Sequence, residues 1–140
     1  MIRKATIEDQ QRITEVRNAV RENQLSPANI PKVADVSRWI FENGAFWVWE
    51  QDGAVQGFSA ADPRDGTIFA LFVHPDYESR GIGRALLSLA CEDLRRAGRT
   101  MAKLTTAPGS RAKRFYRRNG WTDIGREKAE IVFERALTRE

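Results

Sequence analysis

One segment limits the folds open to this chain of 140 residues more than any other. The apolar run "TIFALFV" at 67–73 leads through "HPDYESRGIG" into residues with apolar positions at helical spacing, from about 83 to 97, which end at Gly98. The segment "MAKLTT" at 101–106 then again has the character of a strand. A strand, a helix and a strand in this order form a right-handed crossover between parallel strands. The sequence therefore predicts a sheet that contains at least one parallel pair.

The segments on either side of this unit complete a mixed sheet. Before it, hydrophobic periodicity predicts a strand, two helices and two strands, at 1–7, 8–23, 32–42, 45–50 and 54–62. Asp52-Gly53 joins the last two, because this pair supplies the positive φ of a hairpin turn. After the unit, the chain predicts a short helix and two strands, at 111–120, 121–125 and 130–137. The expected order is β-α-α-β-β-β-α-β-α-β-β, an α/β (α+β) fold with one domain over residues 1–140.

The composition excludes several classes of protein. Hydrophobic residues make up 41% and charged residues 30% of the chain, and the longest apolar runs span about six residues, too few for a membrane helix. The chain has one cysteine, Cys91, and one histidine, His74, so it can form no internal disulfide and offers no cluster of metal ligands. We therefore expect a cytoplasmic protein with no metal and no membrane segment.

The basic residues are concentrated in the second half of the chain. Residues 1–75 carry eight Lys or Arg against ten Asp or Glu, whereas residues 76–140 carry fifteen against nine. This asymmetry favours an anionic partner, either a phosphorylated small molecule or nucleic acid, although a solvated basic surface gives the same pattern. The basic half lacks aromatic residues interleaved with basic ones and any known recognition motif, so no nucleic acid is expected.

The glycine loop indicates which anion is involved. A strand that passes through Gly81-x-Gly83 into a helix presents unpaired backbone N–H groups at the positive end of the helix dipole, which suits a phosphate. A dinucleotide fingerprint would place a third glycine at Leu86 and an acidic residue near Thr105 or Thr106, and a P-loop would need Gly-Lys-Ser/Thr. None of these is present. A phosphate loop of another kind and a tight turn without ligand both stay open at this point.

Two segments together resemble a known family. "ALFVHPDYESRGIGRALL" and, about twenty residues on, "AKLTTAPGSRAKRFYRRNGW" resemble the two hallmark segments of the GNAT superfamily of acetyl-CoA-dependent N-acetyltransferases. The predicted element order is similar to that fold over nearly the whole chain. In the family's loop pattern (Gln or Arg, two residues, Gly, one residue, Gly or Ala), Gly81 and Gly83 match, but Glu78 stands at the first position. The resemblance therefore implies backbone contacts to the coenzyme, without a side-chain contact from position 78.

The resemblance implies that acetyl-CoA is the co-substrate. The N–H groups from about Arg80 to Ala85 would bind its pyrophosphate, and its pantetheine would lie along the strand edge before the loop, which bulges and splays in this family. Arg111 or Arg114 can reach the 3′-phosphate, and a hydroxyl of Thr105, Thr106 or Ser110 would make the contact of the family's asparagine. The residues expected to contact acetyl-CoA are Leu71, Phe72, Val73, Arg80, Gly81, Ile82, Gly83, Arg84, Ala85, Ser110, Arg111, Arg114 and Tyr116.

The resemblance also implies catalytic roles. Tyr116 matches the tyrosine of the pattern A-x-x-F-Y-x-x-x-G-[FW] and would protonate the departing thiolate; the alternative is a tyrosine packed beside Phe115. The backbone N–H of Val73 would polarise the thioester carbonyl.

Glu22, Glu50 and Asp62 are candidate general bases, of which we select Glu22 because the family's first two helices line the acceptor pocket, and His74 is a weaker candidate. The expected function is transfer of an acetyl group to a primary amine of a small molecule or peptide, with a homodimer possible. A non-catalytic coenzyme A-binding regulator is the alternative.

Overall fold

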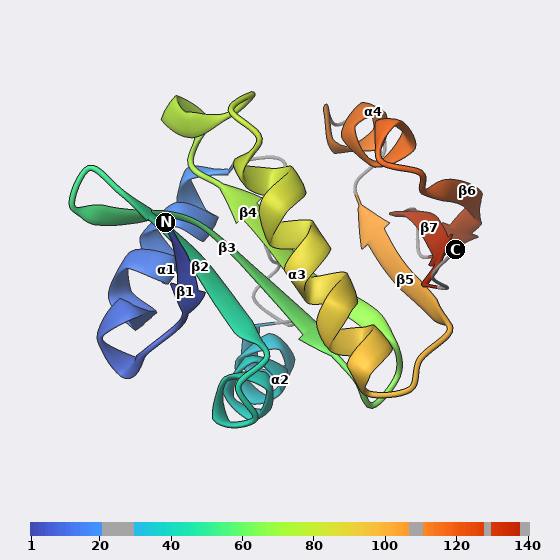
Figure 1. Ribbon diagram of the computed structural model, residues 1–140, viewed down its shortest axis with the longest axis horizontal. Coiled ribbons are helices and arrows are strands. Elements are labelled where there is room, and N and C mark those ends of the chain that lie inside the picture. Colours follow the sequence, from blue (N-terminus) through green and yellow to red (C-terminus); the bar gives the residue numbers. More distant parts are fainter. Residues whose placement is uncertain (21–29, 107–110, 128–129, 138–140) are drawn as a thin grey trace.

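The computed structural model describes residues 1–20, 30–106, 111–127 and 130–137 (Figure 1). Two predicted site residues, Glu22 and Ser110, lie outside these ranges. The order of elements confirms the predicted β-α-α-β-β-β-α-β-α-β-β series. The elements are β1 (Ile2–Lys4), the 3-10 helix η1 (Ile7–Asp9), α1 (Gln10–Ala19), α2 (Ile30–Glu42), β2 (Phe46–Gln51), β3 (Ala54–Asp62), β4 (Thr67–Val73), the 3-10 helix η4 (Pro75–Tyr77), α3 (Ile82–Arg96), β5 (Met101–Thr106), α4 (Arg111–Arg118), β6 (Thr122–Glu127) and β7 (Glu130–Ala136).

The strands form one mixed seven-stranded sheet in the order β1-β2-β3-β4-β5-β7-β6. Only β4 and β5 pair in parallel, on the two sides of the α3 crossover, and the other pairs are antiparallel. The predicted turn between β2 and β3 is present, with φ values of 54° at Asp52 and 80° at Gly53. The crossover from β4 through α3 to β5 predicted from the sequence is thus confirmed.

Helices cover both faces of the sheet. Figure 1 shows α3 across the front of β3 and β4, with α1 and α2 behind. On the rear face, Phe58 stacks between Phe46 and Phe72, with ring centroids 5.6 and 5.3 Å away. On the front face, the indole Nε1 of Trp47 donates a hydrogen bond of 2.7 Å to Asp93 of α3. The alternation of Phe46 and Trp47 explains why this strand is apolar on both sides.

Helix α3 lies close against β3. A Cβ atom added at Gly57 would lie 3.1 Å from both the Phe72 carbonyl oxygen and Cδ1 of Leu86, and 3.3 Å from Cγ2 of Ile82. Two residues on, the buried Ser59 hydroxyl donates a 2.9 Å hydrogen bond to the Leu86 carbonyl. The absence of a side chain at Gly57 and the Ser59 hydrogen bond together fix the distance between α3 and the sheet. Gly57 therefore sets the position of the first turn of α3.

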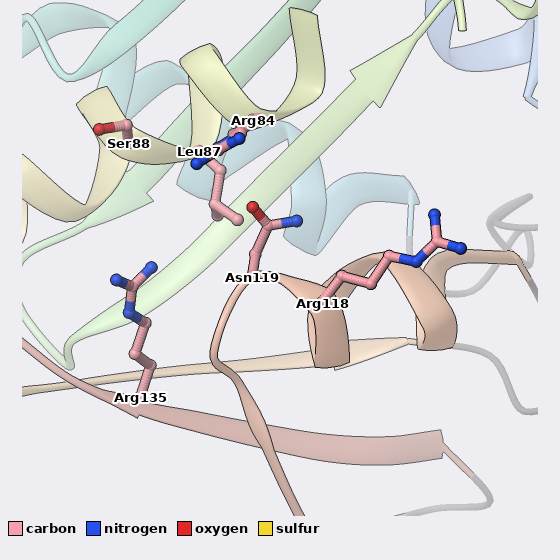
Figure 2. A pocket seen from close by; sticks show the side chains of 6 residues that line it. All are labelled: Arg84, Leu87, Ser88, Arg118, Asn119 and Arg135. Atoms are coloured by element: carbon pink, nitrogen blue, oxygen red, sulfur yellow. The ribbon is translucent and has the colours of Figure 1, made fainter. Parts of the chain in front are cut away.

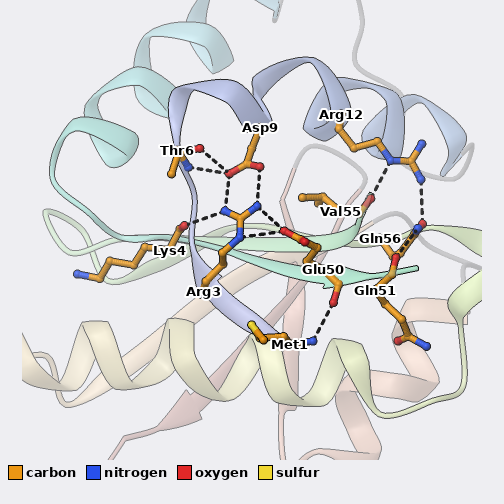
Figure 3. Close-up of polar contacts among 10 residues, drawn as sticks. All are labelled: Met1, Arg3, Lys4, Thr6, Asp9, Arg12, Glu50, Gln51, Val55 and Gln56. Carbon is orange, nitrogen blue, oxygen red and sulfur yellow. Dashed lines mark hydrogen bonds and ion pairs between the residues drawn. The ribbon is translucent and has the colours of Figure 1, made fainter. Parts of the chain in front are cut away.

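A polar network joins the first elements of the chain (Figure 3). The Arg3 guanidinium donates to both Asp9 carboxylate oxygens, at 2.8 and 2.9 Å, and to Oε1 of Glu50 at 2.8 and 3.1 Å. Asp9 is only 7% exposed and also accepts from the Thr6 N–H at 2.7 Å. From α1, Arg12 donates to the Val55 carbonyl at 2.8 Å. These bonds hold η1 and α1 on the rear face of the sheet.

We expect an Asp9→Asn variant to lose about 2 kcal/mol of unfolding free energy at neutral pH, as for loss of a charge-assisted hydrogen-bonded pair. The Arg3 hydrogen bonds hold the pKa of Asp9 below its usual value. A lowered pKa in the folded state contributes stability above the unfolded pKa of about 3.9, and this is lost as the pH falls through the folded value. The difference between wild type and variant should therefore be present at pH 7 and shrink below about pH 4.

Urea unfolding at several pH values measures this difference. The exposed neighbour Glu8 is the control, because Glu8→Gln removes an equal charge from η1 without touching Arg3. A difference between wild type and Asp9→Asn that stays constant down to pH 2 would contradict the role given to the ionised carboxylate.

Candidate active site

The chain between β4 and α3 turns sharply before the helix begins. Ser79 and Gly81 adopt positive φ values of 63° and 82°, and helix α3 starts at Ile82. No atom lies within 4 Å of the position that a Gly81 Cβ would occupy, so this glycine is required by its backbone conformation and the space above it is open. The predicted strand, Gly-x-Gly and helix start are confirmed as a local structure.

The first turn of α3 presents backbone N–H groups outward. The N–H of Ala85 donates to the Gly81 carbonyl at 3.1 Å, which makes it the first donor of the helical series. The amides of Ile82, Gly83 and Arg84 precede it and have no acceptor within the helix. The side chains of Arg80 and Arg84 are exposed beside them. Of the predicted donors, Ala85 is therefore engaged internally, whereas the N–H groups of Ile82, Gly83 and Arg84 have no helical acceptor and can face an anion.

Strand β4 leaves one edge unpaired beside this helix terminus. It pairs with β5 only at Thr67 and Lys103, although β4 continues to Val73. Its pairing with β3 shifts register between Ala60 and Ala61, because one extra residue of β4, Phe69, is inserted there. A bulge of this kind bends and twists a strand. The sheet thus opens between β4 and β5 at the end nearest the glycine loop.

The hydrogen-bond register shows which groups line the open edge. The His74 N–H donates to the Gln56 carbonyl at 2.7 Å, and Phe72 lies opposite Phe58 in the same register. Bonded and non-bonded pairs alternate along antiparallel strands, so Phe72 bonds toward β3, whereas Leu71 and Val73 point their N–H and C=O groups toward β5. The open edge therefore carries the backbone groups of two of the three predicted β4 residues.

Phe115, rather than Tyr116, lies beside the glycine loop. A Cβ added at Gly83 would be 3.4 Å from Cζ of Phe115 and 3.6 Å from Cγ2 of Val73. The Tyr116 ring is 7% exposed and packs against Trp121 and Phe133, with centroids 5.9 and 5.6 Å apart. Burial raises the pKa of the Tyr116 phenol well above its usual value. Tyr116 is thus a buried, fully protonated phenol on the helix that faces the loop.

A basic pocket lies between α3, α4 and β7 (Figure 2). It has a volume of about 310 Å³, and no carboxylate is among the described residues around it. Figure 2 shows Arg84 and Leu87 projecting from α3, Asn119 from the end of α4, and Arg135 from β7. The Asn119 side chain is held in place by a 2.8 Å hydrogen bond from its Nδ2 to the Phe115 carbonyl. The residues that line the pocket are Arg84, Leu87, Ser88, Arg118, Asn119 and Arg135.

Sequence reasoning missed most of this pocket. It selected Arg111 and Arg114 on α4, but Arg114 is exposed and does not line the pocket, and the side chain of Arg111 lies outside the described part. Arg118 was available from its position in α4. Arg135 had no local signal, because only the placement of β7 beside β5 brings it near α3.

Three of the base candidates have hydrogen-bond or ion-pair partners. Glu50 accepts from Arg3. Asp62 is 5% exposed and paired with Arg64 at 2.8 Å, which lowers its pKa. Asp62 also lies opposite Thr67, at the far end of β4 from Val73. His74 accepts a hydrogen bond at Nδ1 from the Asp76 N–H, at 3.1 Å. Each of these three side chains is thus engaged in another contact, and Glu22 lies outside the described residues.

Within the described ranges, no three His, Cys, Asp or Glu side chains gather in a way that could hold a metal ion. None of the helices in those ranges combines the length and the apolar character needed to cross a bilayer.

The parallel strands β4 and β5 separate beside a glycine turn that leads into a helix, which is the arrangement that the resemblance to the GNAT superfamily implies. The profile of the family described as "Acetyltransferase (GNAT) domain" matches residues 42–123. The chain belongs to this family. It is 32% identical, over 112 residues, to a relative from Methanocaldococcus jannaschii described as an uncharacterized N-acetyltransferase. That match covers 69% of this chain and 47% of the relative, so the chain spans about half the length of the relative.

Solved structures show the same fold. PaiA N-acetyltransferase from Thermoplasma acidophilum, in complex with coenzyme A, superposes with a TM-score of 0.77 at 19% identity, over 97% of this chain and 98% of that one. YncA from Salmonella typhimurium, with its cofactor acetyl-CoA, has a TM-score of 0.69 at 21% identity, over 100% and 95%. The ribosomal-protein-S18-alanine N-acetyltransferase of Escherichia coli has a TM-score of 0.73 at 17% identity, over 100% and 95%.

Proposed function

We propose that this protein transfers the acetyl group of acetyl-CoA to a primary amine of a small molecule or peptide, by direct attack in a ternary complex. The observation that supports the proposal is the open edge of β4, where Val73 does not pair with β5 and its Cγ2 lies 3.6 Å from the Cβ position of Gly83 in α3. Family membership supports it, and so do the similar folds of PaiA with coenzyme A and YncA with acetyl-CoA.

The described residues fit coenzyme A by charge and by space. The amides of Ile82, Gly83 and Arg84 form an anion site of the kind that binds a pyrophosphate, and the space above Gly81 is open. The edge at Leu71 and Val73 offers two N–H groups and two carbonyls to the amides of a pantetheine arm. The basic pocket lies on the same side of α3 as α4 and suits the 3′-phosphate.

The chain's own residues then provide for each part of the reaction. Bound acetyl-CoA supplies the acetyl thioester. The Val73 N–H donates a hydrogen bond to the thioester carbonyl and stabilises the negative charge that develops on its oxygen as the amine attacks. The Tyr116 phenol gives its proton to the departing sulfur. Glu22 accepts the proton that the amine loses, directly or through water.

We expect Arg118→Ala and Arg135→Ala each to raise the KM for acetyl-CoA about tenfold, because each removes one charge-assisted contact to a phosphate. The KM for acetyl-dephospho-CoA, which lacks the 3′-phosphate, should change little. Initial rates with the two donors measure this difference in selectivity.

Arg114→Ala is the matched control, since it removes an exposed arginine from the same helix outside the pocket. If Arg114→Ala is the variant that loses selectivity for the 3′-phosphate, the pocket is not the phosphate site and the expectation from the sequence holds instead.

The proposed activity is tested by thiol release from acetyl-CoA against a panel of small amines and peptides with free amino termini or lysines. We expect acetyl-CoA to raise the Tm and at least one amine to accelerate thiol release. If acetyl-CoA neither stabilises the protein nor is consumed with any amine, the proposal is wrong.

One observation favours a second function. Tyr116 is packed in the core, and Glu50 and Asp62 are each paired with an arginine, as a non-catalytic coenzyme A-binding regulator would permit. Binding of coenzyme A without turnover of any amine would support that function. The cytoplasmic location and the homodimer stay predictions of the sequence.

A further inference from the structure

A contact outside the proposed site joins the β2–β3 turn to the glycine loop. The Tyr77 hydroxyl in η4 donates a 2.5 Å hydrogen bond to Oδ2 of Asp52. Asp52 is held in its turn at a φ of 54°, and the Tyr77 N–H donates to the His74 carbonyl at 2.8 Å. The two side chains are 25 positions apart in the chain. The tip of the hairpin is therefore tied to the segment that precedes α3.

The same tyrosine contacts the first cation of the loop. The guanidinium carbon of Arg80 lies over the Tyr77 ring, 5.0 Å from its centroid, within the range of a cation–π contact. The His74 and Tyr77 rings also make an edge-to-face contact, with their centroids 6.4 Å apart, which further restrains the tyrosine ring. Arg80 itself is exposed and would otherwise sample many rotamers. Asp52 fixes the ring, and the ring restrains Arg80.

Charge alone does not account for an aspartate at this place. A carboxylate near an anion site weakens anion binding, because like charges repel. Its contact with Tyr77 is exposed, and exposed polar contacts add little to the stability of a fold. The positive φ of the turn accounts for an aspartate at position 52 but not for its contact with Tyr77, and the Tyr77 ring touches Arg80.

We propose that Asp52 and Tyr77 are positioning residues that hold Arg80 in place for the pyrophosphate of coenzyme A. The proposal rests on the proposed function, because it requires that the loop binds the coenzyme. It assigns the tip of the β2–β3 hairpin a part in coenzyme affinity and none in the acetyl transfer step.

The test is calorimetric titration of the full chain with coenzyme A for Tyr77→Phe, Asp52→Asn and the double variant. Asparagine tolerates the positive φ of position 52, and phenylalanine keeps the ring under Arg80. Tyr77→Phe removes the donor of the bond, and Asp52→Asn replaces its charged acceptor with a neutral amide oxygen, so each single variant should bind coenzyme A more weakly, roughly three- to tenfold for Tyr77→Phe and less for Asp52→Asn. The double variant should be no weaker than Tyr77→Phe, since both changes act on the same bond.

Asp76→Asn is the matched control. It removes an exposed carboxylate from η4, beside Tyr77, without touching the Asp52 hydrogen bond. If charge alone mattered, both Asp52→Asn and Asp76→Asn would bind coenzyme A more tightly. If positioning matters, Asp52→Asn binds it more weakly and Asp76→Asn does not. With saturating acetyl-CoA, kcat and the KM for the amine should match wild type in all variants, and an unchanged Tm shows that the fold is intact.

Two results overturn the proposal in different ways. In the first, the wild type binds coenzyme A, and Tyr77→Phe and Asp52→Asn bind it equally well or more tightly. This result would rule out the positioning role and leave the proposed function in place. In the second, the wild type binds no coenzyme A. This result would rule out the proposed function and, with it, the positioning role.

Discussion

Replacing Tyr116 with phenylalanine should lower kcat about 100-fold while the KM for acetyl-CoA stays near its wild-type value. Loss of a general acid typically costs two to four orders of magnitude, and a thiol leaving group with a pKa of about 8.5 places this case at the lower end. Thiol release at saturating acetyl-CoA and amine measures the effect. Because phenylalanine keeps the ring against Trp121 and Phe133, the core packing should persist.

The pH dependence of kcat is a second test of the role of Tyr116. Burial raises the pKa of Tyr116, so the phenol stays protonated throughout the range in which an ordinary tyrosine begins to ionise, near pH 10. We therefore expect no loss of kcat through ionisation of Tyr116 up to about pH 10. A Tyr116→Phe variant with the full wild-type rate and an unchanged Tm would remove Tyr116 as the acid.

Replacing Gly57 with valine should destabilise the fold by about 3 kcal/mol, the upper part of the range for overpacking a core. A Cβ at this position lies 3.1 Å from the backbone oxygen of Phe72, which cannot move without disturbing the β3–β4 pair. The other near atoms belong to Leu86 and Ile82, so α3 would have to move away from the sheet. For a chain of this length, the Tm should fall by about 10 °C.

Gly83→Ala is the matched control for stability. Gly83 has an ordinary φ, and its added Cβ would meet only ordinary contacts at 3.4 Å or more. We expect its Tm to stay within about 2 °C of wild type, since surface and helix substitutions of this kind change the unfolding free energy little. If Gly57→Val were as stable as Gly83→Ala, the close approach of α3 to β3 would not hold in solution.

The displacement of α3 should also reach the proposed site. Ile82 contacts the space that a Gly57 side chain would fill, and Ile82 is the first residue of the helix that presents its amides to an anion. Weaker coenzyme A binding by folded Gly57→Ala would show that the sheet supports this helix terminus.

Local patterns of the sequence predicted the elements well, because they depend on neighbours in the chain. The apolar run "TIFALFV", the Asp52-Gly53 turn and the Gly81-x-Gly83 step each express a preference of a few neighbouring residues, and each forms the predicted strand, turn or helix start. The family resemblance was carried by the same local segments and is confirmed by the match at residues 42–123.

The assignment of individual side chains was less complete, because adjacent residues on a helix point in directions about 100° apart. Spacing could not tell that Phe115 would lie beside Gly83 and that Tyr116 would be buried against Phe133 of β7. It also could not tell that the N–H of Ala85 would be engaged by Gly81.

The sequence by itself determined the order of elements, the parallel crossover, the glycine turn before α3 and the family. Only the tertiary structure decided which cations surround the basic pocket, which backbone groups line the open edge of β4, and that Asp52 meets Tyr77. The reason is physical: the first set follows from backbone preferences and periodicity over neighbouring residues. The second follows from strand order and register. These place Arg135 near α3 and the β2–β3 turn beside η4, and the residues that meet are too far apart in the sequence for a local pattern to predict the contact.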